Sequence, residues 1–564
     1  MFFKSFFCSL LLASGVAAAP QASTPSLSKR CTNSADDRTC WGDYDISTNY
    51  YEEIPDTGVT REYWWDIVNI TAAPDGVERF VLAINGSIPG PTIIADWGDT
   101  VVVHLTNSME NNGTSIHFHG IRQNFTIQND GVSSVTQCPI PPGGTYTYTW
   151  IATQYGSSWY HSHFAVQAWD GIFGGILING PATANYDEDL GNLFLNDWYH
   201  LDAATMAIRA EYGPPKLNNG LINGTNVYDD GGSRFETTFE AGKRYRLRLV
   251  NAAADTVFRF AIDNHTLEVI AADFVPIVPY TTDVLAITMG QRYDVIVTAD
   301  ADVENVSDFW MRAVIQDTCS NNENSDNVRG IVRYDTSSTS DPTTTAWPAA
   351  NVNGTCYDED MSDLVPYVAI NPSDADVTDN FDVQVVSGGS NTFLWKMGSH
   401  TFINLWEYPS LQQLNEGNDS WTEQQQVYEV PDADQWVYFI IQEPSSGVPH
   451  PMHLHGHDFW VLGQGTGTYN SSTVSLNMVN PPRRDVVQLP GNGYVVIAFK
   501  SDNPGIWTVH CHIAWHLAEG LAIQILERES EVAALIDQDQ LDSTCAAWDA
   551  YVSADNIVQT DSGI

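Results

Sequence analysis

The chain has 564 residues, of which 24 are lysine or arginine and 70 are aspartate or glutamate. This length exceeds what one hydrophobic core needs, so we expect two to four domains. The formal net charge of −46, with no cluster of basic residues, excludes electrostatic attraction to nucleic acid or to an anionic membrane surface. Because 43% of the residues are apolar and only 17% are charged, the sequence indicates a folded protein and not a disordered one.

The first thirty residues carry targeting signals. Lys4, the apolar run 6–16 and the small residues 17–19 have the pattern of a secretory signal peptide, which we predict over residues 1–19. Residues 20–30 end in Lys29-Arg30, as a pro-peptide closed by a dibasic protease site does. No other stretch approaches the roughly 20 apolar residues that a membrane span requires. We therefore expect a secreted, extracellular protein without a membrane anchor.

Seven cysteines follow the signal peptide, and an extracellular location permits disulfides. Cys511 stands between two histidines, so we expect it to bind a metal. The other six allow 15 pairings. Proximity in the sequence favours two local bridges and leaves one long-range bridge: Cys31–Cys40, Cys319–Cys356 and Cys138–Cys545. Glycosylation sequons fit an extracellular surface, and they include Asn69, Asn112, Asn264 and Asn470.

Short strand-like runs bounded by Gly, Pro, Asn and Asp dominate the chain, and two kinds of run recur three times. The first kind occupies residues 99–107, 243–251 and 434–442. The second occupies residues 144–150, 290–297 and 493–499, and an aromatic-led strand follows each copy at Trp159, Trp310 and Trp507. This alternation predicts antiparallel sandwiches or barrels.

Three all-β domains are therefore expected, over residues 31–182, 183–350 and 351–564. The segment 337–350, rich in Ser, Thr, Asp and Pro, has the composition of a linker. One helix is predicted near residues 529–538.

Ten of the 15 histidines lie in four short windows, residues 117–119, 161–163, 450–455 and 510–516. Each window holds a pair separated by one residue, and on a strand such a pair projects to one face, where it can supply ligands to neighbouring metal ions. The middle repeat has Met311 and Arg312 after Trp310 and lacks these histidines. Its isolated His200 and His265 are predicted to be structural. Metal is therefore expected between the first and third domains.

The types of ligand separate two kinds of site. A thiolate from Cys511 with the imidazoles of His450 and His516 is the ligand set of a blue-copper electron-transfer centre, and the other eight imidazoles suit a polynuclear copper cluster. Zinc favours closed four-ligand sites. A zinc protein would not need a cysteine that is flanked on both sides by ligands of a second cluster. His510 and His512 would connect the two sites through few bonds, which predicts a path for electrons.

Four motifs resemble the copper signatures of multicopper oxidases: His117-Phe-His-Gly, Trp159-Tyr-His-Ser-His, His450-Pro-Met-His-Leu-His-Gly and His510-Cys-His-Ile-Ala-Trp-His-Leu-Ala-Glu-Gly-Leu521. The similarity covers nearly the whole chain after the signal and pro-peptide. It is greatest to ascomycete laccases in three segments: 31–40, 480–485 and 561–564. The resemblance implies three cupredoxin-like Greek-key domains and four copper ions, one of type 1, one of type 2 and two of type 3.

The resemblance also assigns ligands. Type 1 copper would take His450, Cys511 and His516, with Leu521 in the axial position and without a donor atom. Type 2 copper would take His117 and His453. The two type 3 ions would be held by the sets His119, His161, His512 and His163, His455, His510.

Further roles follow from the same resemblance. Asp130 resembles an acidic residue that relays protons beside the type 2 copper, although an Asp-Gly turn explains it equally well. Asp230 or Asp229 of the second domain would contact the substrate, unless both belong to a solvated acidic turn. The residues 561–564 resemble a C-terminal plug of the solvent channel. Phe118 in place of Trp, and Ala518-Glu519 in place of a Ser-Gly type pair, leave the substrate preference and the potential open.

The predicted function is that of a secreted laccase, which oxidises phenols and aromatic amines at type 1 copper and reduces O2 to water at a trinuclear cluster. The alternatives are bilirubin oxidase, ascorbate oxidase or ferroxidase activity, or a non-catalytic electron carrier that would need only the type 1 set. The expected partners are small aromatic substrates and O2, without nucleic acid or membrane, and the chain is expected to be a monomer. A lignin-derived compound, a pigment precursor and a toxic phenol all remain open as the physiological substrate.

Overall fold

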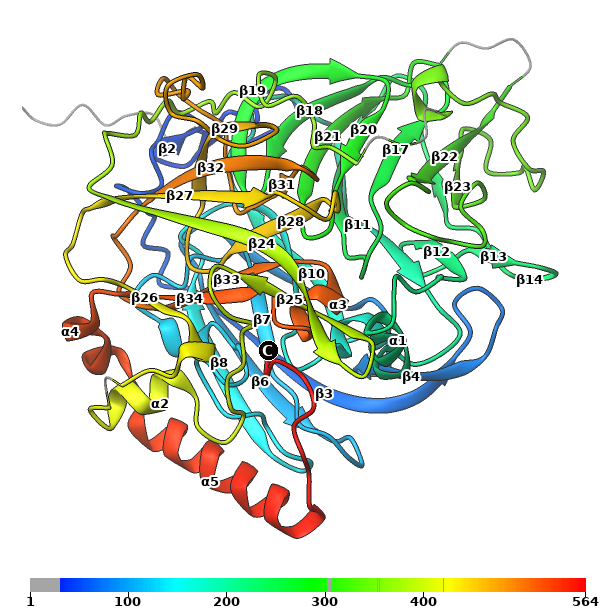
Figure 1. Cartoon of the computed structure of the whole chain (residues 1–564). Helices are drawn as coiled ribbons and strands as arrows, with labels where there is room; N and C mark the ends of the chain where they lie inside the picture. The colour runs from blue at the N-terminus through cyan, green and yellow to red at the C-terminus, as the bar shows by residue number, and fades with distance from the viewer. Residues whose placement is uncertain (1–30, 302–305, 352–353, 355, 419) are drawn as a thin grey trace, which may run out of the picture.

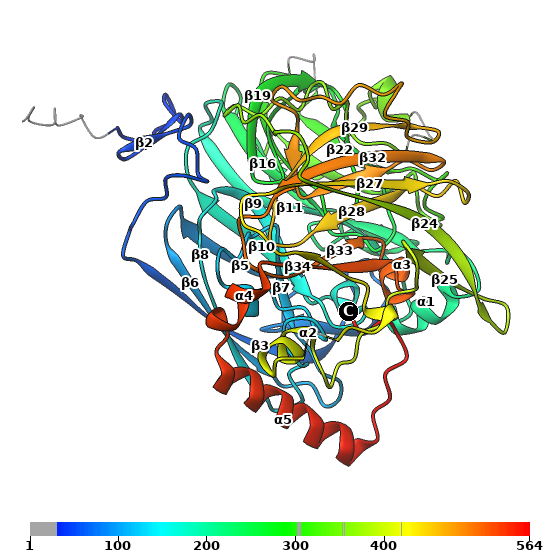
Figure 2. The ribbon, with the colours of Figure 1, turned by 60° about the vertical axis from the view of Figure 1, so that its left-hand side comes forward.

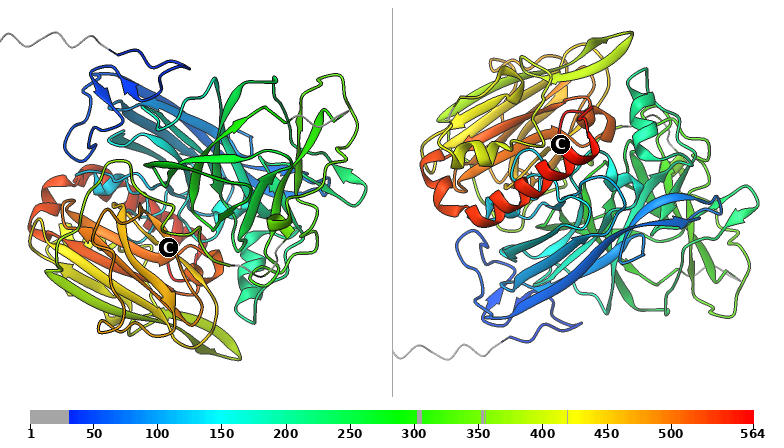
Figure 3. Two further views of the ribbon diagram at one scale, coloured as in Figure 1. Left: turned by 90° about the horizontal axis from the view of Figure 1, so that it is seen from above. Right: turned by 90° about the horizontal axis from the view of Figure 1, so that it is seen from below.

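The computed structural model describes residues 31–564 except 302–305, 352–353, 355 and 419 (Figure 1). The predicted signal peptide and pro-peptide lie outside the described residues. In the described part, six sheets of four to six strands form three two-layered sandwiches, which appear as three lobes when the molecule is seen from above (Figure 3). The all-β prediction is confirmed.

The first sandwich packs a sheet of order β4-β3-β6-β8 on a sheet of order β5-β10-β9-β7. In β6, Val101, Val103 and Leu105 point into the core and alternate with half-exposed residues, which is the pattern of a strand with one buried face. A small hairpin of β1 and β2 precedes this sandwich in the chain. The elements are β1 (Cys40–Trp41), β2 (Tyr44–Asp45), β3 (Thr60–Ala72), β4 (Arg79–Ile84), β5 (Gly90–Asp96), β6 (Thr100–Asn107), β7 (Ile116–His119), β8 (Thr145–Ile151), β9 (Gly156–Ser162) and β10 (Phe173–Asn179).

The second sandwich joins sheets of order β12-β11-β16-β21-β18-β19 and β15-β23-β22-β17-β20. The elements are β11 (Glu188–Trp198), α1 (Ala203–Ala210), β12 (Asn219–Ile222), β13 (Val227–Tyr228), β14 (Gly231–Gly232), β15 (Glu236–Thr238), β16 (Arg244–Asn251), β17 (Phe258–Ile262), β18 (Leu267–Ala272), β19 (Val275–Thr282), β20 (Leu285–Ile287), β21 (Arg292–Thr298), β22 (Asp308–Ile315) and β23 (Arg329–Arg333).

The third sandwich joins sheets of order β25-β24-β27-β32-β29-β30 and β26-β34-β33-β28-β31. The elements are β24 (Val377–Gly389), β25 (Thr392–Met397), α2 (Ser410–Asn415), β26 (Val427–Val430), β27 (Trp436–Glu443), β28 (His450–Leu454), β29 (Phe459–Thr466), β30 (Arg483–Arg484), β31 (Val486–Leu489), β32 (Gly493–Lys500), β33 (Gly505–Cys511), α3 (Ala514–Ala518), β34 (Ala522–Glu527), α4 (Glu529–Val532) and α5 (Gln538–Asp555).

The repeated runs of the sequence occupy matching places in the three sandwiches. The first kind forms β6, β16 and β27, the second kind forms β8, β21 and β32, and the two kinds pair antiparallel in each sandwich. The aromatic-led strands are β9, β22 and β33. Because the middle copy carries Arg312 where the others carry ligands, it forms an ion pair with Asp263 at 2.7 Å instead.

The helix predicted over residues 529–538 is wrong in its extent. The chain there forms the short helix α4 and a 3₁₀ turn at Ala533–Leu535, and the long helix α5 begins only at Gln538. Asp537 explains this start, because its side chain accepts a hydrogen bond from the Gln540 N–H and caps the new helix. None of the described helices is both long enough and apolar enough to cross a membrane.

All three predicted disulfides are confirmed, and Cys511 is a buried free thiol. The bridge Cys138–Cys545 joins the first sandwich to α5, which lies along the outer edge of the molecule. After α5 the chain turns back and ends near the middle of the molecule (Figure 2).

Candidate metal centre

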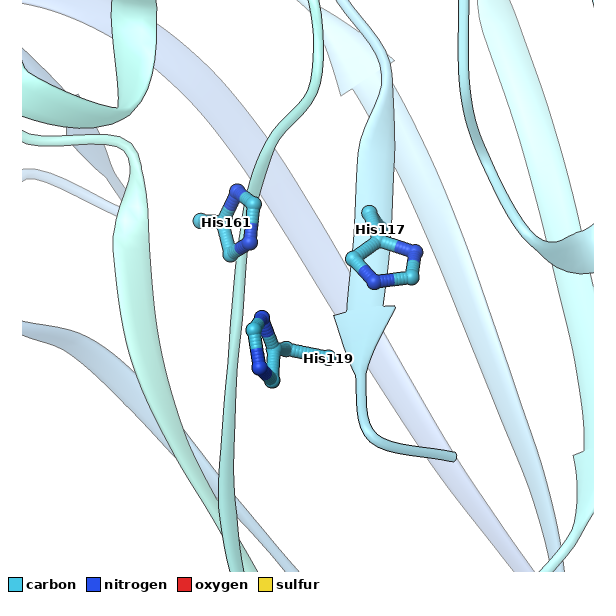
Figure 4. A group of neighbouring side chains, drawn as sticks. All are labelled: His117, His119 and His161. Carbon is cyan, nitrogen blue, oxygen red and sulfur yellow. The ribbon is translucent and has the colours of Figure 1, made fainter. Parts of the chain in front are cut away.

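Strand pairing in the first sandwich brings three histidines together. β7 and β9 are antiparallel, with His117 opposite His161, so that the rings of His117, His119 and His161 face one another across the two strands (Figure 4). Nitrogens of these three rings lie within 4.8 Å of one another. Every residue of β7 and β9 is buried, so the rings are withdrawn from water.

The third sandwich supplies the other half of the cluster. β28 and β33 are antiparallel, with His453 opposite His510. The His455 Nε2 and His510 Nε2 atoms are 3.1 Å apart, and His163 of the first sandwich completes a group with nitrogens within 4.8 Å. His512 follows β33, and its ring centroid lies 5.0 Å from that of His119. The structure therefore joins eight histidines from the two outer sandwiches, as the sequence predicts.

The outer nitrogens of these rings are held by the protein. Backbone carbonyls accept from the Nδ1 atoms of His117 at 2.8 Å, His453 at 2.8 Å and His510 at 2.9 Å. Their acceptors belong to Asp130, Asp485 and Cys511 respectively. Hydrogen bonds of this kind fix the tautomer and the orientation of a metal-binding imidazole.

Several inner nitrogens, in contrast, have no hydrogen-bond partner among the described residues. They are His117 Nε2, His119 Nδ1, His161 Nε2, His163 Nδ1, His163 Nε2, His453 Nε2, His512 Nδ1 and His512 Nε2. Buried polar atoms are normally paired. A group of unpaired imidazole nitrogens therefore fits metal ions that imidazole binds well, such as copper.

Burial also sets the protonation state of the ligands. It lowers the pKa of His510 to about 4 and that of His450 to about 3. It holds the pKa of His119, His161 and His163 well below the usual range. These rings are therefore neutral at ordinary pH, the form in which imidazole binds a metal.

Two carboxylates touch the cluster. Asp130 is buried, and its Oδ2 lies 2.9 Å from His455 Nδ1, while its Oδ1 lies 3.2 Å from His117 Nδ1. Asp485, which the sequence analysis missed, lies 3.2 Å from His119 Nε2 and is paired with Arg292 of the second sandwich. An Asp-Gly turn is therefore not the whole role of Asp130.

A second group of ligands lies a short way from the cluster. Cys511 Sγ is 3.5 Å from His450 Nδ1 and 3.6 Å from His516 Nδ1, and the two nitrogens are 3.1 Å apart. A point in this triangle lies about 2 Å from all three atoms, which is the length of a metal–imidazole bond. Burial raises the pKa of the Cys511 thiol, so a bound metal is what would keep it as thiolate.

Comparison with known proteins agrees with this geometry. Three models of the family described as multicopper oxidase match residues 66–183, 189–337 and 382–531. The chain belongs to the multicopper oxidase family.

Relatives of this multicopper oxidase include laccases. Laccase-2 of Botryotinia fuckeliana is 48% identical over 97% of this chain and 95% of its own length. Oxidoreductase OpS5 of Beauveria bassiana is 49% identical over 95% of this chain and 93% of its own length. The crystal structure of a laccase from Botrytis aclada matches with a TM-score of 0.90 at 47% identity, covering 95% of this chain and all of that one. The three sandwiches thus have the cupredoxin-like multicopper oxidase fold.

A cavity of about 400 Å³ reaches the group of His450, Cys511 and His516, of which His516 lines the cavity. The Trp395 ring covers that imidazole, with ring centroids 4.2 Å apart. Leu521 is fully buried beside the group, and its carbonyl accepts from the Cys511 N–H at 3.1 Å.

The structure does not bring Asp229 or Asp230 to this cavity. Both are exposed, and they form the turn of the small β13–β14 hairpin, where Asp229 has a left-handed φ of 46°. The solvated acidic turn is thus the better interpretation of this pair. Asp255 lines the cavity instead.

Asp255 follows three alanines, and no pattern in the sequence distinguishes it. Its backbone is held by Asp197, whose carboxylate accepts from the N–H groups of Ala254 and Asp255 at 2.9 Å each. The Ala254 carbonyl accepts from the Ala514 N–H at 2.9 Å, which joins this loop to the helix that carries His516. The place of Asp255 at the cavity is therefore apparent only from the packing of this loop.

The two isolated histidines of the middle repeat, His200 and His265, form ordinary hydrogen bonds. His200 Nε2 is 2.9 Å from Asp75, and His265 Nε2 is 2.7 Å from the Tyr334 hydroxyl. Phe118 packs in the core of the first sandwich against Tyr148 and Trp150 and does not reach the ligands.

The last residues of the sequence are anchored beside the cluster. Ser562 donates from its N–H to the Ala518 carbonyl at 3.0 Å and from its hydroxyl to the Leu517 carbonyl at 2.8 Å. Ile564 is 1% exposed. Leu517 also lines a small internal cavity with His163 and His510. The tail is thus bonded to one residue of that cavity's wall.

Replacing Cys511 by Ser should abolish the blue absorption and the oxidation of phenols, because the thiolate is the ligand that produces the colour and the shortest link to the cluster. Far-ultraviolet circular dichroism should match the parent protein, which serves as the control for folding. Blue absorption retained in the folded variant would contradict the assignment of Cys511.

Deleting residues 561–564 should change the rate of oxygen reduction more than the rate of type 1 reduction, because the tail is anchored on Leu517 beside the small cavity. Stopped-flow measurement of the two half-reactions, with the parent protein as control, separates them. Equal rates for both half-reactions in the deletion and the parent would show that the tail does not act on oxygen reduction.

Proposed function

We propose that this multicopper oxidase is a secreted, monomeric laccase that oxidises phenols and aromatic amines one electron at a time and reduces O2 to water. The observation that carries the proposal is the course of a single segment. Its His516 closes the aromatic-lined cavity, its Cys511 joins His516 in the type 1 group, and its His510 and His512 belong to the buried cluster. An electron accepted at the cavity thus has a short covalent path to the site that oxygen would reach.

The ligand sets of the proposal are those implied by the family pattern. His450, Cys511 and His516 would hold type 1 copper, and His117 with His453 would hold type 2 copper. The two type 3 ions would take His119, His161, His512 and His163, His455, His510. When bound, these four ions supply one-electron oxidation and the four-electron reduction of oxygen.

The protein's own residues orient the reactants and move protons. Asp255 faces the substrate cavity and is positioned to accept the proton that a phenol loses as its ring gives up an electron. Burial and the nearby charge of Asp197 raise the pKa of Asp255, which makes it a stronger base once ionised. Asp130, in contact with His117 and His455, is the residue that would deliver protons to reduced oxygen.

The geometry disfavours a simple electron carrier. Such a protein needs the type 1 group alone, and it would gain nothing from eight further imidazoles, six of which have buried nitrogens without partners among the described residues. Binding them into a fold without a metal would cost about 1–3 kcal/mol for each unpaired group.

Oxygen uptake with a neutral phenol should show the largest kcat/KM among four reductants: the phenol, ascorbate, bilirubin and ferrous iron. The reason is the cavity at His516, whose lining includes the rings of Phe393, Trp395 and Trp515 and therefore suits a small aromatic ring. The stoichiometry should be four phenols for each O2 without released hydrogen peroxide. A higher kcat/KM for ferrous iron, ascorbate or bilirubin would replace the laccase assignment by the corresponding activity.

Replacing Asp255 by Asn should lower kcat/KM for phenols by about a hundredfold, the scale of a lost general base. In the parent, phenol oxidation should rise with pH as Asp255 ionises, and the variant should lose that rise. Ferrocyanide gives an electron without a proton, so its oxidation is the control and should fall far less. An equal loss for both reductants would show that Asp255 does not accept the proton.

A further inference from the structure

The cavity above His516 has a one-sided charge. Three carboxyl side chains line it, those of Asp255, Asp317 and Glu519, and among its described lining residues there is no lysine or arginine. Its walls also carry the aromatic rings of Phe393 and Trp395. Carboxylates and aromatic faces both attract a positively charged group, so the cavity favours a cation over an anion.

Glu519 is the unusual member of the three. It is only 6% exposed, and its Oε1 atom is buried with no hydrogen-bond partner among the described residues. A buried acceptor without a partner is costly and uncommon in native proteins. Because Glu519 lines the cavity, a donor that arrives with the substrate would give this carboxyl the partner that it lacks.

The backbone around Glu519 keeps the carboxyl in place. Its N–H donates to the Trp515 carbonyl at 2.9 Å, and its own carbonyl accepts from the Trp395 N–H at 3.1 Å. Both of these tryptophans line the same cavity. These bonds fix the backbone of Glu519 relative to two residues that line the cavity with it.

Glu211 lies near Glu519, and its negative charge disfavours the ionised form of the Glu519 carboxyl. Glu519 also lines a second cavity of about 450 Å³, and Glu211 lines that cavity but not the first. Burial and the charge of Glu211 raise the pKa of Glu519 to about 8. A positive group in the first cavity would supply the missing opposite charge and lower that pKa.

We propose that Glu519 determines specificity by binding the ammonium group of substrates that carry one on a short chain beside the oxidised ring. This inference rests on the laccase activity proposed above. The ammonium donates a charge-assisted hydrogen bond to the unpaired Glu519 oxygen and lies against the aromatic walls, while the ring reaches His516. Aromatic substrates with a carboxylate on the same chain are disfavoured, because the ionised carboxyl groups of the cavity repel them.

Three catechols that differ only in the chain on the ring test the proposal: one with an ethyl chain, one with an ammonioethyl chain and one with a propionate chain. The measured quantity is kcat/KM for each relative to the ethyl compound, from oxygen uptake near pH 8, where the Glu519 carboxyl is partly ionised and the ammonium group keeps its charge. In the parent protein the ammonium compound should exceed the ethyl compound about tenfold, and the propionate compound should fall below it.

Glu519→Gln keeps the shape of the side chain and removes its charge, so it should bring the ammonium-to-ethyl ratio close to one. Glu211→Gln is the matched control, because it makes the same change outside the first cavity. It should keep the ratio or raise it. A change in the type 1 potential would alter all three rates together and leave the ratio unaffected.

The outcomes separate this proposal from the proposed function. If the parent fails to oxidise the ethyl compound, the laccase assignment is wrong. If it oxidises all three compounds with equal kcat/KM, or if Glu519→Gln keeps the ammonium preference, the role of Glu519 is wrong and the laccase assignment stands. An equal loss of the ratio in both variants would also overturn it, because the preference would then arise from the general negative charge.

Discussion

The burial of eight imidazole rings between two sandwiches is the constraint on which the rest of the structure depends. Several of these rings are held by backbone carbonyls or carboxylates through one nitrogen, and six of the eight have a buried nitrogen without a partner among the described residues. Desolvation keeps the rings neutral, so they do not repel one another as cations would. Such a cluster suits the binding of metal ions, and strands on both sides hold its rings in place.

The second sandwich supplies none of the cluster histidines, but its residues contact the cluster and line the cavity. Arg292 at the start of β21 is paired with Asp485, which in turn contacts His119, so the second sandwich supports the cluster from outside. The same sandwich supplies Asp255 to the substrate cavity. A repeat that lost its histidines has thus become the support of one site and part of the wall of another.

Much of the architecture could be predicted from local patterns. Alternating apolar residues specify one-sided strands, and histidines two residues apart on a strand share a face, so the strands and the group of cluster histidines follow from spacing alone. The disulfides follow from proximity and from the exclusion of Cys511. Each of these features depends on residues close together in the sequence or on the number of cysteines that remain to be paired.

The substrate side could not be predicted in this way. Asp255 reaches the cavity because Asp197, from a distant strand, holds the backbone of its loop. Asp230, which the family pattern suggested instead, belongs to an exposed hairpin. Likewise, Glu519 departs from the family pattern, but its unpaired oxygen is apparent only when the walls of the cavity are in place. Contacts between distant loops decide these roles.

The metal content of the purified protein, measured by elemental analysis together with electron paramagnetic resonance, tests the cluster most directly. We expect four copper ions for each chain, of which the type 1 and type 2 ions give separate signals and the coupled type 3 pair gives none. One copper for each chain, or zinc in the cluster, would contradict the central claim that the eight buried imidazoles form a trinuclear copper site.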